Sequence, residues 1–217
     1  MSQILTLVGI STLQTLEMVL FSTLFSMVIG FPLGVLLYST NFMGITPRPI
    51  LNQVLSRIVN VLRSFPFIIL MILLFPLSRL ILGTSIGTTA TIIPLSIAAA
   101  PFVARLVETA LLEVDPGMIQ AARAMGSTNS QIIYKVLIPE SMPSLVSGIT
   151  LTIINLIGYS AMAGTIGGGG LGDLAIRYGY QRFRPDVMAA SVVVIIVMVE
   201  LIQFVGTRIA NRMLANR

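Results

Sequence analysis

Residues 187–207 read VMAASVVVIIVMVELIQFVGT, a stretch in which Glu200 is the only charged side chain. A helix of this length rises about 30 Å, which matches the hydrocarbon core of a bilayer. Four other stretches are also long enough and predominantly apolar: residues 16–38, 58–80, 87–107 and 145–166. The sequence therefore predicts an all-α, polytopic membrane protein whose five transmembrane helices form a single domain over residues 1–217.

The composition of the chain supports a membrane protein and excludes several other classes. It has 217 residues, of which 55% are hydrophobic and only 10% are charged, against about 25% charged residues in a typical soluble domain. Without Cys or His, it lacks the usual ligands of structural metal sites and the usual general base near neutral pH. The acidic residues are scattered, and the basic residues lie at the ends of apolar runs. We therefore expect neither an enzyme nor a nucleic-acid-binding protein.

Prolines lie inside three of the predicted spans, with Pro66 and Pro76 in the second and Pro94 and Pro101 in the third. In a membrane bundle, neighbouring helices and hydroxyl side chains can satisfy the carbonyl groups that a proline leaves free. We therefore expect each stretch to remain one span. The same holds for the first span, which Gly30, Pro32 and Gly34 interrupt.

The basic residues predict the orientation, because cytoplasmic loops carry an excess of Lys and Arg. With the amino terminus outside, the segments that face the cytoplasm hold nine basic residues: Arg48, Arg57, Arg63, Arg105, Arg123, Lys135, Arg208, Arg212 and Arg217. The outer segments hold four: Arg79, Arg177, Arg182 and Arg184. Five spans then place the carboxyl terminus in the cytoplasm. Because five spans cannot be halved into two repeats, we infer that a second copy of the chain completes the pathway.

Residues 111–142, between the third and fourth spans, carry the signals of two short helices. Asp115 is a suitable N-cap residue and Pro116 suits the first helical position. The helix that follows, over residues 118–125, has small side chains at Ala121, Ala122 and Ala124, and Gly126 ends it. Small side chains let such a helix enter a groove of another protein, or pack closely against its own bundle. The pattern by itself favours neither interpretation.

A second short helix is predicted from the pair Thr128 and Gln131, which have the spacing of a capping box. We expect this helix to stop at Pro139, because a proline cannot supply the amide that a helix interior requires. The segment is thus predicted to be two short helices with a tight break, at the membrane surface.

The segment QAARAMGSTNSQIIYKVLIPESMP, residues 120–143, resembles the EAA loop of ABC-importer permeases. In that loop Glu-Ala-Ala is followed by three residues, Gly, and then I-x-L-P at a fixed spacing. Ala121, Ala122 and Gly126 match the motif, and residues 137–139 lie near its end. Gln120 departs from it, because the family has Glu there; a salt bridge from this position is therefore not expected.

The resemblance extends over nearly the whole chain. RSFPFIIL (63–70), AAPFVARLVETALLEV (99–114), GYSAMAG (158–164) and GGGGLGDLAIRYGYQRF (167–183) are similar to the permeases of methionine ABC importers. The resemblance implies a type I importer permease in the inner membrane of a bacterium. It also implies the partners: a second copy of the chain, two ATP-binding cassette ATPase subunits and a substrate-binding lipoprotein on the outer, periplasmic face.

The resemblance assigns ATP and Mg²⁺ to the ATPase partners, and the sequence has no G-x-x-x-x-G-K-[ST] loop that would hold them. Residues 167–170 lack the Lys and Ser or Thr of such a loop, and we interpret them as a flexible outer turn. The family's coupling helix corresponds to residues 116–126, which would dock in a cleft of the ATPase and transmit its closure to the spans. The coupling residues on this interpretation are Pro116, Gln120, Ala121, Ala122, Arg123, Met125 and Gly126.

Candidate pathway residues lie on the fourth span: Asn155, Tyr159, Ser160 and Met162. Asn155, Tyr159 and Met162 have i, i+4, i+7 spacing and therefore share one helix face. A polar face with a thioether suits an amino acid that has an apolar side chain, and the resemblance places this helix along the pathway with Met162 as a gate. Helix–helix packing explains the same stripe almost as well. Glu200 either lines the pathway or pairs with a partner helix near the inner leaflet.

The sequence therefore predicts the permease subunit of an ATP-driven importer of methionine, in its L form and with the D form left open, that works by alternating access. One alternative is a permease of the same superfamily for another small amino acid. The other is an ion-coupled carrier or channel that works without an ATPase. Such a carrier would need carboxylates within the membrane, and Glu200 is the only one expected at depth.

Overall fold

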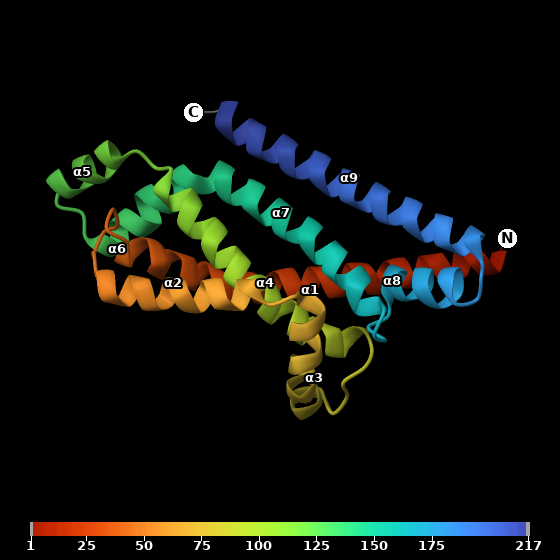
Figure 1. Ribbon diagram of the computed structural model, residues 1–217. Helices are drawn as coiled ribbons and strands as arrows, with labels where there is room; N and C mark the ends of the chain where they lie inside the picture. Colours follow the sequence, from red (N-terminus) through yellow and green to blue (C-terminus); the bar gives the residue numbers. More distant parts are fainter. Residues whose placement is uncertain (1, 216–217) are drawn as a thin grey trace.

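The computed structural model describes residues 2–215, and all regular structure in this range is helical (Figure 1). The α-helices of these residues are α1 (Ser2–Thr40), α2 (Pro49–Ser64), α3 (Phe67–Leu82), α4 (Thr88–Leu112), α5 (Pro116–Ala124), α6 (Asn129–Ile132), α7 (Ile138–Gly164), α8 (Gly170–Leu174) and α9 (Pro185–Ala215). Two π-helical segments, Ile133–Leu137 and Ala175–Tyr180, continue α6 and α8. The prediction of an all-α protein is confirmed.

Four helical stretches are each long and apolar enough to cross a membrane: Ile4–Thr40, Thr88–Leu112, Asn129–Gly164 and Pro185–Ala215. They correspond to the first, third, fourth and fifth predicted spans. The second predicted span is instead two helices, α2 and α3, which meet at a bend of 102°. The described residues thus provide four spans, or five where the bent pair crosses as one.

The expectation that Pro66 lies inside a continuous helix is wrong. A proline ring disfavours the helical conformation of the residue before it, and Phe65 is extended, with φ −70° and ψ 131°. Pro66 itself has ψ 130° and immediately precedes α3. As a result α3 leaves the line of α2 and projects from the side of the bundle (Figure 1). The other span prolines, Pro32, Pro76, Pro94 and Pro101, remain inside helices as expected.

The most extensive helix contact joins α1 to α4. Gly30 and Gly34 lie about one turn apart on α1, and neither has room for a side chain. A Cβ atom on Gly30 would stand 2.5 Å from the carbonyl oxygen of Ala100, and one on Gly34 would stand 2.6 Å from that of Ala104. Small residues at this spacing let membrane helices approach closely. The glycines that interrupt the apolar sequence therefore form the surface on which α1 packs against α4.

Buried polar side chains in the bundle are hydrogen-bonded, as a membrane interior requires. Hydroxyl groups donate to carbonyl oxygens of the preceding turn, as in Thr23 to Val19 at 2.7 Å and Ser96 to Ile92 at 2.6 Å. In the part of the chain that the structure describes, no fully buried side-chain nitrogen or oxygen lacks a partner. The interior therefore tolerates its many Ser and Thr residues.

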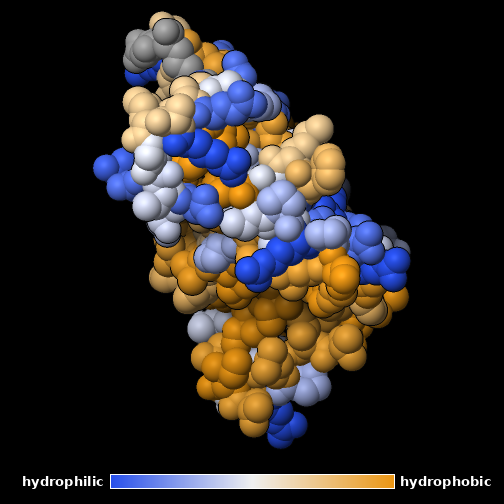
Figure 2. Space-filling view, turned by 90° about the vertical axis from the view of Figure 1, so that its left-hand side faces the viewer, coloured by the Kyte–Doolittle hydropathy of each residue, from blue (hydrophilic) through white to orange (hydrophobic). Residues whose placement is uncertain are grey.

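The two ends of the molecule differ. α5 and α6 lie at one end, toward which the carboxyl end of α9 also runs, whereas α8 and the amino terminus lie at the other (Figure 1). Viewed from the α5 end, most hydrophilic residues lie in the upper part of the surface, among apolar ones, whereas apolar residues dominate the lower part (Figure 2). Exposed apolar side chains also run along α9, among them Val193, Ile196 and Leu201. This pattern fits a helix covered by lipid or by another chain.

Candidate functional site

α5 begins and ends where the sequence predicts. The Oδ1 atom of Asp115 accepts a hydrogen bond of 2.8 Å from the amide of Gly117, and Pro116 occupies the first position of the helix. Beyond the last helical residue Gly126 has φ +80°, in the left-handed region that favours glycine. Local capping chemistry thus fixes both ends of this short helix.

The predicted coupling residues fall on two faces of α5. Pro116, Gln120, Ala121, Arg123, Met125 and Gly126 are exposed. Ala122, in contrast, is 3% exposed and packs in a cluster that includes Leu111, Ile132 and Leu137. Its small side chain therefore holds α5 close to the bundle and is not available to a partner. Packing against the chain's own bundle thus explains Ala122, whereas docking of the exposed face in a groove of another protein stays a prediction.

Arg123 attaches α5 to a distant part of the chain. Its Nη2 atom donates a hydrogen bond of 3.0 Å to the carbonyl oxygen of Ile45, in the loop between α1 and α2. Ile45 is itself buried in the same cluster as Ala122. A displacement of α5 would therefore act on the α1–α2 loop as well as on the segment that follows.

The second short helix does not stop at Pro139, so that prediction is wrong. The capping box is present: the amide of Gln131 donates to Oγ1 of Thr128 at 3.3 Å, and the amide of Thr128 donates to Oε1 of Gln131 at 2.8 Å. The π-helical segment Ile133–Leu137 then carries the chain into α7, with Pro139 in the first turn of that helix, where its missing amide is tolerated. The result is one helical stretch over Asn129–Gly164.

The candidate pathway residues on α7 separate into two groups. Asn155 and Met162 are exposed, and Tyr159 lies between them with its ring stacked on Phe67 of α3 at 4.5 Å between centroids. These three residues share a face, as their spacing predicts. Ser160 is buried on another side of the helix, where its hydroxyl donates to the carbonyl oxygen of Ile157 at 2.8 Å. Ser160 thus does not line the face that carries the other three.

A charged network that the sequence analysis did not single out joins α2 to α4. Arg105 forms an ion pair of 2.6 Å with Glu108, whose side chain is 5% exposed. The same guanidinium donates to the Ser56 carbonyl oxygen at 3.2 Å and to Oδ1 of Asn60 at 3.1 Å. Asn41, after α1, donates to Glu108 at 3.4 Å. Counting basic residues assigned Arg105 only to a cytoplasmic segment. Its i, i+3 spacing from Glu108 could have indicated the ion pair, because residues three apart on a helix are neighbours.

A cavity of about 220 Å³ lies at the bend between α2 and α3. Arg63 lines it, with the guanidinium carbon 5.9 Å from the ring centroid of Phe102, together with Phe67 and Tyr159. Phe102 belongs to the middle part of α4, so the exposed Arg63 side chain lies beside the middle of a helix that is long enough to span a membrane. The ion pairs of the described residues involve other arginines.

The turn at Gly167–Gly170 is packed, contrary to the expectation of a flexible segment. The amide of Gly170 donates to Oε1 of Gln14 at 3.0 Å, and that of Leu171 donates to Oγ1 of Thr15 at 2.9 Å. Gly167, Gly169 and Gly170 all have positive φ, which few other residues adopt. The glycines thus shape a turn that fastens α8 to α1.

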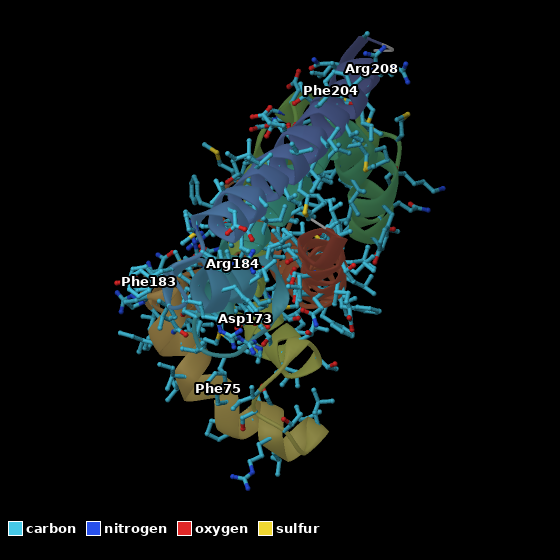
Figure 3. The ribbon with its side chains drawn as sticks, turned by 90° about the vertical axis from the view of Figure 1, so that its right-hand side faces the viewer. Phe75, Asp173, Phe183, Arg184, Phe204 and Arg208 are labelled. Carbon is cyan, nitrogen blue, oxygen red and sulfur yellow. The ribbon has the colours of Figure 1, made fainter. Side chains whose placement is uncertain are left out.

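The end that carries α8 presents charged and aromatic side chains, among them Asp173, Phe183 and Arg184 (Figure 3). Arg177 is ion-paired with Asp173, and the hydrogen bond to this carboxylate raises the pKa of the guanidinium above its ordinary value. Phe183 is 87% exposed and has φ +53°, an uncommon conformation for a residue with a side chain.

Glu200 lies on the exposed side of α9, in a shallow groove with Gln203, Thr207 and Arg208. Figure 3 places Phe204 and Arg208 on this helix, away from the α8 end. Gln203 donates to the Thr207 hydroxyl at 2.9 Å. Whether Glu200 lines a pathway or pairs with another helix stays a prediction.

Several known proteins are similar to this chain in sequence. The family described as "Binding-protein-dependent transport system inner membrane component" matches residues 30–215. The chain is 50% identical over 202 residues to the "Probable D-methionine transport system permease protein MetI" of Vibrio cholerae, covering 93% of this chain and 90% of that protein. It is 49% identical over 176 residues to the "Methionine import system permease protein MetP" of Bacillus subtilis, covering 81% and 79%.

A solved structure has the same fold. It is described as "Inward facing conformations of the MetNI methionine ABC transporter", in its native crystal form. One chain of it superimposes on this chain with a TM-score of 0.96 at 47% identity, covering 98% of this chain and 99% of that one. The similarity therefore extends over all the elements described above.

Proposed function

The chain belongs to the family of inner membrane components of binding-protein-dependent transport systems, and from this premise we propose that it is the permease subunit of an ATP-driven methionine importer. The observation that carries the proposal is that similarity to methionine permeases covers nearly the whole chain, including the exposed helix α5. Importers of this kind need a surface for the motor and a path for the solute, and α5 and α7 supply a candidate for each.

The assembly that we propose has two copies of this chain, two ATP-binding cassette ATPase subunits and a substrate-binding lipoprotein. The exposed apolar side chains of α1 and α9 and the exposed pathway face of α7 support a second copy, since one chain leaves them uncovered. We place the amino terminus and α8 outside and α5 in the cytoplasm, with the α2–α3 pair as the fifth span. The exposed Tyr180 and Phe183 near α8 then face the lipoprotein.

In this assembly α5 couples the ATPase to the membrane helices. Its exposed residues, among them Gln120, Arg123 and Met125, would enter a cleft of the ATPase, while Ala122 packs on the chain's own core. ATP and Mg²⁺ are bound by the ATPase, since this chain has no phosphate-binding loop. Closure of the ATPase would move α5, and the continuous stretch Asn129–Gly164 would carry the movement to Asn155, Tyr159 and Met162. Alternating access follows when this face opens in turn to each side.

Reconstitution tests the proposal. Vesicles that contain the chain, its ATPase and its binding protein should take up radiolabelled L-methionine when ATP is supplied on the ATPase side, and unlabelled D-methionine should be tested as a competitor. A catalytically inactive ATPase provides the control, because it should assemble but not transport. Absence of ATP-dependent uptake contradicts the proposal. If another amino acid competes better than methionine, that amino acid is the transported solute. Uptake by the chain alone would favour a carrier or channel.

A further inference from the structure

Arg63 is an unusual cation for a membrane helix pair. It is the penultimate residue of α2, and its guanidinium lies beside the ring of Phe102, in the middle part of the spanning helix α4. A charge at such depth is costly, and it usually faces a watery cavity or pairs with an acidic group. Among the described residues no carboxylate lies within ion-pair distance of Arg63, while a cavity does adjoin it. The site thus has a positive charge and space for a negative one.

Four of the eight residues that line this cavity are aromatic: Phe65, Phe67, Phe102 and Tyr159. Phe67 and Tyr159 form a parallel stack on one side, Phe102 lies under the guanidinium, and the buried Leu70 completes the apolar lining. The volume of about 220 Å³ is smaller than the roughly 300–1,000 Å³ of pockets for drug-sized ligands. It is large enough for a single amino acid and too small for a peptide.

Hydrogen bonds between α2 and α4 fix the position of the turn that precedes Arg63. One turn earlier on α2, Asn60 accepts a hydrogen bond of 3.1 Å from Arg105 of α4, and the same guanidinium reaches the carbonyl oxygen of Ser56 at 3.2 Å. These bonds hold the last turns of α2 against α4. The bend at Phe65 and Pro66 then directs Phe67 back onto Tyr159 of α7. Four helices, α2, α3, α4 and α7, are thereby joined around one cavity.

We propose that this cavity is a binding site for the transported amino acid, with the α-carboxylate on Arg63 and the apolar side chain against Phe67, Phe102 and Leu70. Guanidinium and carboxylate form strong charge-assisted hydrogen bonds in a fixed geometry. A thioether also makes favourable contacts with aromatic rings, at about 5 Å from sulfur to ring. The inference rests on the proposed function, which supplies the amino acid; the cavity supplies the place and the contacts.

The test is equilibrium binding of radiolabelled L-methionine to the permease–ATPase complex in lipid nanodiscs, without the binding protein. Arg63→Gln should weaken binding roughly tenfold to a hundredfold, as the loss of a charge-assisted bond predicts, and Arg63→Lys should retain part of it. Methioninol, which lacks the carboxylate, should compete poorly with the unaltered complex. It should compete almost as well as methionine with the Arg63→Gln complex. Norleucine should compete nearly as well as methionine, because it keeps the carboxylate and the apolar side chain.

Arg57→Gln is the matched control, because Arg57 is an exposed arginine of the same helix that does not line the cavity. Equal loss of binding in both variants would overturn the assignment, and so would equal competition by methioninol and methionine in the unaltered complex. Two rival roles also have distinct results. Loss of the dimer in Arg63→Gln with unchanged binding would mean that Arg63 pairs with a second copy. Displacement of methionine by phosphatidylglycerol would mean that an anionic lipid headgroup occupies the cavity.

Failure of this inference is distinguishable from failure of the proposed function. ATP-dependent methionine uptake by the full assembly, with unaltered KM in the Arg63→Gln variant, would overturn the binding site and leave the importer intact. Absence of uptake in the unaltered assembly would contradict the importer itself.

Discussion

Nη2 of Arg123 lies 3.0 Å from the carbonyl oxygen of Ile45, and this bond links α5 to the loop between α1 and α2. The partners are separated by 78 residues in the chain, so the contact fixes tertiary structure and not only local helix geometry. It gives α5 a second attachment to the bundle besides the helical stretch that starts at Asn129. Both attachments would have to move when α5 moves.

Replacement of Arg123 by Gln should therefore loosen the connection between α5 and the spans. A hydrogen bond from a charged donor contributes about 1.5–3 kcal/mol when buried, and less at an exposed position such as this one. We expect the complex to assemble but to hydrolyse severalfold more ATP for each methionine that it transports. Arg48→Gln, at an exposed arginine of the α1–α2 loop, should leave the amount of ATP hydrolysed per methionine unchanged. An unaltered ratio in Arg123→Gln would show that the bond does not contribute to coupling.

Gly126 should tolerate asparagine but not valine. Its φ of +80° costs a residue with a side chain roughly 1–2 kcal/mol, and a β-branched residue most of all, whereas Asn adopts this conformation readily. A Cβ atom there would meet nothing within 4 Å, so the effect on this chain is one of backbone conformation. We expect Gly126→Val to reduce both uptake and co-purification of the ATPase. Equal activity of the Val and Asn variants would contradict this explanation.

Gly34→Ala should destabilise the bundle. A Cβ atom at this position would stand 2.6 Å from the Ala104 carbonyl oxygen and also from Cβ of Val107, so α1 and α4 would have to move apart. Overpacking of this kind costs about 1–3 kcal/mol, which should lower the midpoint of thermal unfolding in detergent by several degrees. Gly9→Ala, at a position with nothing within 4 Å, is the matched control and should leave the midpoint unchanged or raise it slightly.

The Arg105–Glu108 pair predicts a non-additive double-mutant cycle. Glu108 is almost fully buried, so Arg105→Gln leaves a carboxylate without its ionic partner and should cost about 3 kcal/mol of unfolding free energy. The double variant Arg105→Gln/Glu108→Gln removes both charges and should be more stable than Arg105→Gln alone. Denaturant unfolding of the single and double variants in detergent measures the coupling. Additive losses would show that the two side chains contribute independently.

The sequence predicted α5 well because its ends depend on neighbours in the chain. Asp115 caps the amide of Gly117. Gly126 adopts a left-handed conformation, which the choice of glycine at this position is enough to predict. The four apolar helices were predictable for a similar reason, since length and composition alone decide whether a helix can span a bilayer. The capping box of Thr128 and Gln131 is a third local signal that the structure confirms.

Prolines show what the sequence could not decide. Pro94 and Pro101 are buried within α4, where neighbouring helices cover the freed carbonyl groups, and that helix continues. Pro66 is exposed at the end of α2, and there the chain bends by 102°. Pro139 lies in the first turn of α7, directly after the π-helical segment Ile133–Leu137, which the apolar periodicity of the sequence does not predict. The same residue type thus has three outcomes, because tertiary surroundings decide among them.

The cavity beside Arg63 was missed because its walls come from four helices that are distant in the sequence. Hydropathy and charge counting placed Arg63 in a cytoplasmic loop, since they carry no information about the bend that brings it next to Phe102. Only Tyr159 of this group was a predicted pathway residue, and its partner Phe67 comes from a helix 92 residues earlier, 159 minus 67. Contacts of this kind follow from the fold and not from spacing in the sequence.

The length of α7 has a mechanical consequence. Its 27 residues extend about 40 Å at 1.5 Å per residue, which is longer than the hydrocarbon core of a bilayer is thick. A helix of that length acts as a lever arm: a tilt of about 7° about its inner end moves the outer end by roughly 5 Å. A motor beneath the membrane therefore needs only a short stroke to open a gap as wide as an amino-acid side chain on the far side.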